Sequence, residues 1–114
     1  MMSTAPLFPM NREQATRLQS YIQMYRQYAF STLMPSVERN TTLRTLQVIQ
    51  GKVIEAMDQN TPVLQVLFTR EERVVLKAVA SELLQLSARQ PESKERLETL
   101  GDLAALKQSL NILS

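Results

Sequence analysis

The five prolines of this 114-residue chain stand between long stretches that contain none. A proline inside a helix removes a backbone hydrogen bond and clashes with the preceding turn, and it disfavours helical geometry in the residue before it. Helices are therefore expected to end before Pro35 and Pro91, while Pro62 suits the first turn of a helical segment. Because the chain has only two glycines and no tryptophan, these stretches favour helix over a small β fold.

Apolar residues recur between the prolines with the spacing of an amphipathic helix. They predict an all-α, four-helix bundle-like single domain over residues 11–114, with helices over 12–34, 41–59, 70–89 and 92–111. The last helix is expected to bend or break near Gly101, because its apolar residues before and after that position lie on different sides.

Polar residues with capping ability mark the helix starts. Two pairs have the spacing of a capping box, in which each residue bonds the other's backbone N–H: Asn11 with Gln14, and Thr69 with Glu72. The start of the second helix stays open, since Ser36 and Thr41 are both weak candidates for its N-cap.

Two segments carry apolar residues without helical periodicity. Residues 1–10 are expected to form a flexible N-terminal arm, unless Leu7, Phe8 and Met10 dock on the core. The short connector 61–68 is too apolar for a solvated loop. Its threonine–proline start predicts a single helical turn, covered by the core, by another chain, or by both.

The stretch YIQMYRQYAF, residues 21–30, holds four of the six aromatic residues of the chain. The apolar arc of this helix spans about half its circumference, which is wider than the stripe of about 100° that one neighbour covers. Tyr25 lies near the middle of the arc and is expected in the core, whereas Phe30 falls outside the arc. The residues at its edge are Tyr21, Met24 and Tyr28, for which core, protein interface and small-molecule pocket all stay open.

The composition removes several chemistries. The chain has no cysteine and no histidine, so it cannot form a disulfide, a zinc-thiolate site or a thiol nucleophile, and it lacks the commonest general base. Glycines at two isolated positions cannot build a phosphate-binding loop. We therefore expect a protein that is not an enzyme, with no cofactor and no metal site.

These observations predict a helical protein-interaction or regulatory module that associates with itself, most simply as a dimer, or with another protein. Excess apolar surface on short amphipathic helices motivates the prediction. The expected partner-binding residues are Tyr21, Met24, Tyr28, Val66, Leu67 and Phe68.

Two alternatives remain open at this stage. A nucleic-acid accessory protein would use scattered cations of the N-terminal half, although the net charge is only +2. The cations in question are Arg12, Arg17, Arg26, Arg39 and Arg44. The second alternative is a small-molecule-binding bundle with a cavity beside the tyrosines.

The location expected from the sequence is the cytoplasm, without a membrane partner. No run of 18 apolar residues is present, and the first ten residues lack the charged head and apolar centre of a signal peptide.

Overall fold

The computed structural model describes residues 7–89 and 93–113, with side chains to Leu110. It contains four helices and a two-stranded sheet in the order β1 (Leu7–Asn11), α1 (Arg12–Thr32), α2 (Val37–Ala56), β2 (Val63–Leu67), α3 (Arg70–Ala88) and α4 (Lys94–Leu113). The predicted all-α, four-helix bundle-like architecture is confirmed.

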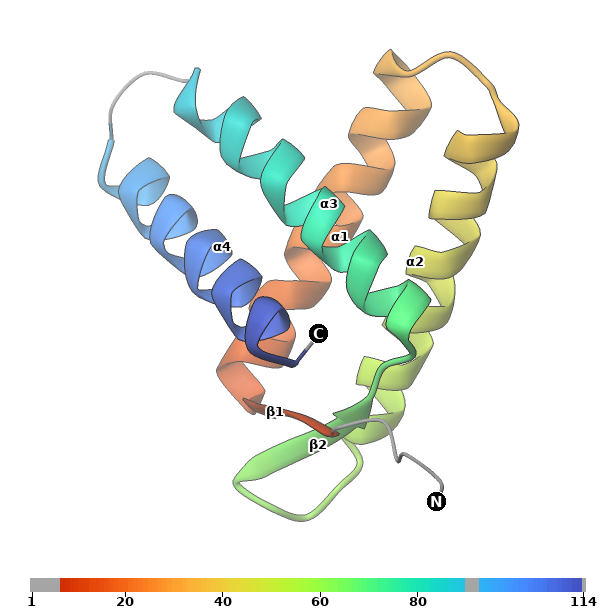
Figure 1. Ribbon diagram of the computed structural model, residues 1–114. Helices are drawn as coiled ribbons and strands as arrows, with labels where there is room; N and C mark the ends of the chain where they lie inside the picture. Colours follow the sequence, from red (N-terminus) through yellow and green to blue (C-terminus); the bar gives the residue numbers. More distant parts are fainter. Residues whose placement is uncertain (1–6, 90–92, 114) are drawn as a thin grey trace.

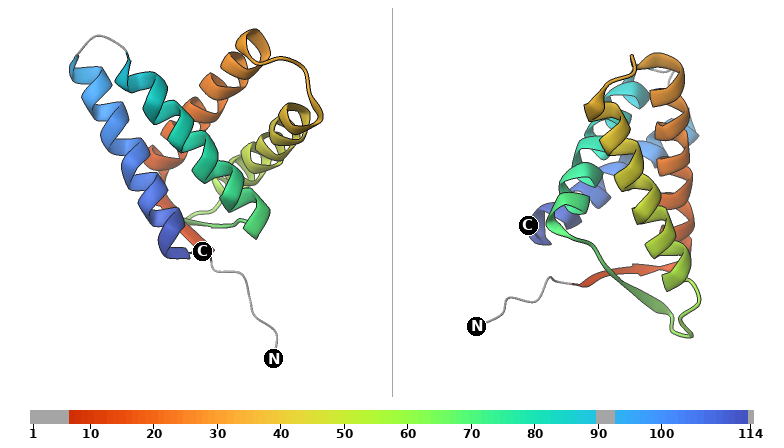
Figure 2. Two further views of the ribbon diagram at one scale, coloured as in Figure 1. Left: turned by 45° about the horizontal axis from the view of Figure 1, so that its top comes forward. Right: turned by 90° about the vertical axis from the view of Figure 1, so that its right-hand side faces the viewer.

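The helices form two antiparallel pairs that diverge away from the sheet, as Figure 1 shows. One pair is α1 with α2 and the other is α3 with α4, and α3 also contacts both helices of the first pair. The sheet lies at the closed end of this V, and the ends of α1 and α3 lie with the starts of α2 and α4 at its open end (Figure 2). None of the helices in the described part of the chain combines the length and apolar character needed to span a membrane.

The two strands decide the structure of both segments without helical periodicity. β1 pairs antiparallel with β2, with Phe8 opposite Val66 and Met10 opposite Leu64, and these four side chains are buried. The single helical turn predicted for the connector 61–68 is therefore wrong, because the two-residue alternation of β2 places every second side chain in the core. Of the two possibilities for the N-terminal arm, docking on the core holds for Phe8 and Met10, while Leu7 stays exposed and residues 1–6 lie outside the described residues.

Helix ends follow the capping residues closely. Both predicted capping boxes are present, at the starts of α1 and α3, and Ser36 is the N-cap of α2, which therefore begins before the expected residue 41. α1 and α2 end two and three residues earlier than expected, at Thr32 and Ala56.

The predicted break in α4 is wrong, because the helix continues through Gly101 without positive φ. Its two apolar sets do not need to be buried together. Leu103 and Leu110 are buried, whereas Leu97 is 55% exposed, so one continuous helix presents Leu103 and Leu110 to the core and Leu97 to solvent.

All six elements contribute to one core. The largest of its side chains that are essentially inaccessible are Phe68, Ile22, Leu46, Ile49, Leu64, Leu76, Leu103, Leu110 and Val53. The rings of Phe8 and Phe68 lie 5.7 Å apart, which joins β1 to the residue that follows β2.

Candidate functional site

The six residues predicted to bind a partner do not form one surface. Val66 and Phe68 are 3% and 1% exposed and belong to the core, so neither can contact a partner while the protein is folded. Leu67 lies between them on the opposite face of the strand and is 50% exposed. The prediction is therefore corrected for Val66 and Phe68, and the reason is the alternation of side chains along a strand.

The aromatic edge of α1 meets helices of the same chain. The Tyr21 hydroxyl donates to Asp102 Oδ2 of α4 at 2.8 Å, and Tyr28 packs against the core with its ring 5.9 Å from that of Tyr25. Tyr25 is buried, as predicted, and its hydroxyl donates to Glu82 Oε2 of α3 at 2.9 Å. Met24 remains 49% exposed, so it is the one residue of the predicted edge that faces mainly solvent.

Both hydrogen-bonded tyrosines stay protonated at neutral pH. Burial of the ring, followed by the hydrogen bond to Asp102, raises the pKa of Tyr21 to about 12. Burial and the hydrogen bond to Glu82 also raise the pKa of Tyr25 well above the ordinary tyrosine value. These hydroxyls therefore act as permanent donors that hold α1 against α3 and α4.

A Tyr25→Phe substitution measures one of these links. Because it removes a donor to a carboxylate while keeping the ring, we expect the free energy of unfolding to fall by about 1–2 kcal/mol. Tyr28→Phe is the matched control, since its hydroxyl has no hydrogen bond within residues 7–89 and 93–110, and it should change stability by less than about 0.5 kcal/mol. Urea titration followed by circular dichroism compares the two, and equal effects would contradict this assignment.

The arginines named for nucleic-acid binding mostly serve contacts inside the chain. Arg12 donates to the carbonyl oxygens of Met57 and Gln59 beyond the end of α2. Arg26 donates to a side-chain oxygen of α2 at 2.8 Å, and Arg39 donates to a backbone carbonyl at 3.2 Å and stacks on a ring of α1 at 5.3 Å.

Of the two remaining arginines, Arg17 pairs with Glu13 and Asp102 at 3.3 and 3.4 Å. Arg44 is exposed on α2. Because most of the five guanidinium groups are already bound to acceptors of the same chain, they give little support to a common surface for a phosphate backbone.

The open edge of β2 is not available for pairing with another strand. The side-chain amide of Gln59 accepts from the N–H of Gln65 and donates to its carbonyl, at 3.1 and 3.0 Å. The hydroxyl of Thr61 and the ammonium of Lys52 donate to two further β2 carbonyl oxygens, at 2.8 and 3.1 Å. Side chains of the same chain thus occupy the backbone groups to which an added strand would bind.

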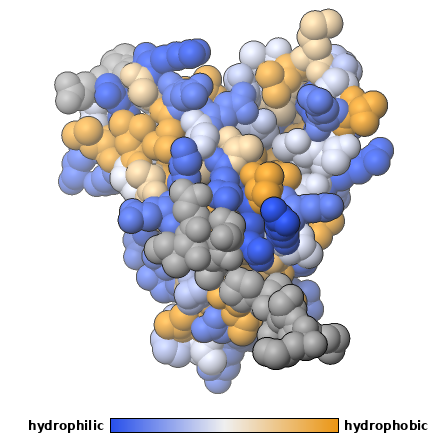
Figure 3. All heavy atoms as spheres, in the orientation of Figure 1, coloured by the Kyte–Doolittle hydropathy of each residue, from blue (hydrophilic) through white to orange (hydrophobic). Residues whose placement is uncertain are grey.

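Three exposed apolar side chains lie close together in the sequence around the connection between α1 and α2. Phe30, Met34 and Val37 are 61%, 84% and 83% exposed, and we call these three residues the α1–α2 tip. Hydrophobic atoms are visible in this part of the surface, at the upper right of Figure 3. The position of Phe30 outside the apolar arc of α1 is the signal in the sequence for this site, but that position alone does not assign the residue to a site.

A hollow of about 410 Å³ lies beside the tip, and we call it the tip hollow. Tyr25, Ala29 and Leu33 provide its apolar wall, and charged and polar side chains of α2 surround it. Its full lining consists of Tyr25, Ala29, Leu33, Met34, Ser36, Glu38, Arg39 and Thr42.

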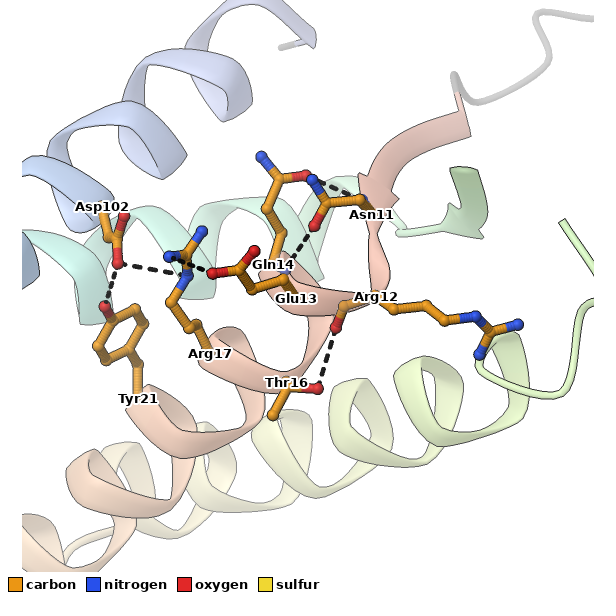
Figure 4. Close-up of polar contacts among 8 residues, drawn as sticks. All are labelled: Asn11, Arg12, Glu13, Gln14, Thr16, Arg17, Tyr21 and Asp102. Carbon is orange, nitrogen blue, oxygen red and sulfur yellow. Dashed lines mark hydrogen bonds and ion pairs between the residues drawn. The ribbon is translucent and has the colours of Figure 1, made fainter. Parts of the chain in front are cut away.

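A smaller cavity of about 110 Å³ lies between β1, α1 and α4, and we call it the α1–α4 pocket. Its apolar lining includes Phe8, Met10 and Leu18, which are all buried, and its polar lining includes Arg17 and Asp102. Figure 4 shows Asp102 reaching from α4 toward Arg17 and Tyr21 on α1.

No cluster of three or more potential metal ligands occurs within residues 7–89 and 93–113.

In the comparisons with known proteins, no family model, no curated protein and no solved structure matches the chain. The candidate functional sites are the α1–α2 tip with its hollow and the α1–α4 pocket.

Proposed function

We propose that this chain is a non-enzymatic protein-interaction module that associates with a second copy of itself through the α1–α2 tip. The observation that carries the proposal is the grouping of three large apolar side chains, each more than 60% exposed, within eight residues around Pro35. Single exposed apolar residues are common on monomers, but grouped ones mark interaction sites. The lack of histidine and cysteine in the sequence supports a role that requires no catalysis.

The shape and charge of the tip suit a second copy. Met34 is the most exposed of the large apolar side chains described, and it borders a hollow with an apolar wall. A two-fold axis beside the tip would bring Met34 of each copy to the hollow of the other, as an isologous interface requires. Glu38 and Arg39 also line this hollow, so the same axis can bring opposite charges of the two copies together.

The size of the surface predicts a weak dimer. A standard interface uses about 20–30 residues from each partner. The tip and its hollow together contain ten different residues, Phe30 and Val37 in addition to the eight that line the hollow. We therefore expect association that depends on protein concentration in the micromolar range or above, and not a permanent dimer.

A Met34→Glu substitution tests the proposal. It places a charge in the centre of the predicted interface, and because Met34 is 84% exposed, the stability of the monomer should change by less than about 0.5 kcal/mol. In sedimentation equilibrium, wild-type protein should show a mass that rises with concentration, and the variant should remain a monomer.

Leu97→Glu is the matched control, since Leu97 is 55% exposed on α4, outside the tip. This control should associate as wild type does. A wild-type chain that stays monomeric at the highest concentrations, or equal loss of association in both variants, would contradict the proposal.

A further inference from the structure

We propose that the α1–α4 pocket binds a small aliphatic α-amino acid, with the ammonium group on Asp102, the carboxylate on Arg17, and the side chain on the apolar floor. This ligand site lies near the closed end of the V and does not depend on association through the tip. The floor of the pocket is apolar. Phe8, Met10 and Leu18 line the pocket and are at most 6% exposed, so they present an apolar wall that is already formed.

The rim of the pocket carries a pair of opposite charges, Arg17 and Asp102. Asp102 Oδ2 accepts from the Tyr21 hydroxyl at 2.8 Å and faces Arg17 Nε at 3.4 Å. Within the described residues, no partner bonds the other carboxylate oxygen, Oδ1, or the second terminal nitrogen of Arg17, Nη2. Within that part of the chain, one acceptor and one donor of opposite charge are thus left on the Arg17–Asp102 ion pair, and they match the ammonium and carboxylate of a zwitterion.

The charge balance favours a zwitterion over an anion. Glu13, at 3.3 Å, and Asp102 already offset the single positive charge of Arg17, so a carboxylate alone would add a third negative group. An ammonium compound alone would leave the free donor of Arg17 unused. A zwitterion adds no net charge and satisfies both groups.

The volume limits the size of the occupant. A cavity of about 150 Å³ holds one benzene ring of six heavy atoms, so the 110 Å³ of this pocket holds about four, which suits the side chain of alanine or 2-aminobutyrate and excludes the larger side chain of phenylalanine. Within the series glycine, alanine, 2-aminobutyrate and phenylalanine, affinity should therefore rise to 2-aminobutyrate and fall at phenylalanine. The contacts are few, so the dissociation constants are expected in the millimolar range.

The test is a titration of the 114-residue chain with glycine and the L-forms of the other three amino acids, followed by amide chemical shifts in nuclear magnetic resonance spectra. Ala105→Leu fills the pocket from the exposed side of α4, and it should weaken 2-aminobutyrate binding about tenfold or more. Ala104→Leu is the matched control, since Ala104 is also exposed but does not line the pocket, and it should bind as wild type does.

Asp102→Asn separates charge from shape. The amide keeps an acceptor for Tyr21 but loses the negative charge, so binding should again weaken about tenfold. Propionate and propylamine, which each carry one of the two charges, should bind more weakly than 2-aminobutyrate. Any of three results would overturn the proposal. The first is a set of amide shifts that no amino acid changes. The others are binding of 2-aminobutyrate by Ala105→Leu as tight as by wild type, and binding of propionate tighter than that of 2-aminobutyrate.

Discussion

Phe68→Ala is expected to lower the free energy of unfolding by about 3–5 kcal/mol. Phe68 is 1% exposed, and its ring lies 5.7 Å from that of Phe8, so the substitution leaves a cavity between the sheet and the helices. The measurement is the urea midpoint, followed by far-ultraviolet circular dichroism.

Leu67→Ala provides the control for this prediction. Leu67 is the neighbouring residue, and because it is 50% exposed, its truncation should cost about 1 kcal/mol. The two variants also test the prediction from the sequence that Phe68 binds a partner. If Phe68→Ala kept the stability of the monomer but abolished association, Phe68 would be an interface residue, and its place in the core would be contradicted.

Lys52→Met is expected to lower the free energy of unfolding by about 3 kcal/mol at neutral pH. Lys52 Nζ lies 2.5 Å from Glu72 Oε1, and the same oxygen accepts from the N–H of Thr69 at 2.7 Å. Glu72 is only 5% exposed, so without Lys52 its carboxylate would be buried with no cation beside it. The comparison is with Arg44→Met, which removes an exposed cation of the same helix and should cost less than about 0.5 kcal/mol.

The effect of Lys52→Met should depend on pH with a definite sign. Burial alone would raise the pKa of Glu72, but the hydrogen bonds and the charge of Lys52, with Thr69, outweigh it and hold the pKa below the ordinary 4.5. A group with a lowered pKa in the folded state stabilises the fold above its unfolded pKa, and this contribution is lost as the pH falls through the folded pKa.

Wild-type stability should therefore decline below a pH of about 4.5, and its advantage over Lys52→Met should shrink over the same range. Urea titrations at a series of pH values measure both curves. A difference between the two proteins that stays constant down to strongly acidic pH would contradict the role of this ion pair.

The elements that the sequence predicted correctly depend on residues close together in the chain. The capping boxes of Asn11 with Gln14 and of Thr69 with Glu72 are present because each requires only one turn of backbone. The place of Tyr25 in the core follows from the direction of its side chain on one helix. The helix ends are off by at most a few residues, because neighbouring caps compete, as Ser36 and Thr41 do.

The errors concern segments whose structure depends on distant residues. Five residues of β2 carry too short a pattern to separate a strand from a helical turn, and only pairing with β1, more than fifty residues earlier, decides the outcome. The break at Gly101 was predicted on the assumption that both apolar sets of α4 must be buried, whereas Leu97 stays exposed.

The candidate sites likewise combine features that nearby residues predict with features that depend on distant residues. Periodicity marked Tyr21 as an edge residue and Phe30 as lying outside the apolar arc, but nothing in the local pattern could indicate that Tyr21 meets Asp102, 81 residues away. The α1–α4 pocket likewise requires β1, α1 and α4 to converge.

The sequence by itself determined the helical class, the capped helix starts and the chemistries that require histidine or cysteine, because these depend on composition and on spacings within one or two turns. Only the tertiary structure decided the pairing of the strands, the burial of Phe68 and the convergence of charges at the pocket. Those features arise from packing between elements far apart in the chain, where the burial gained by the whole fold outweighs local preference.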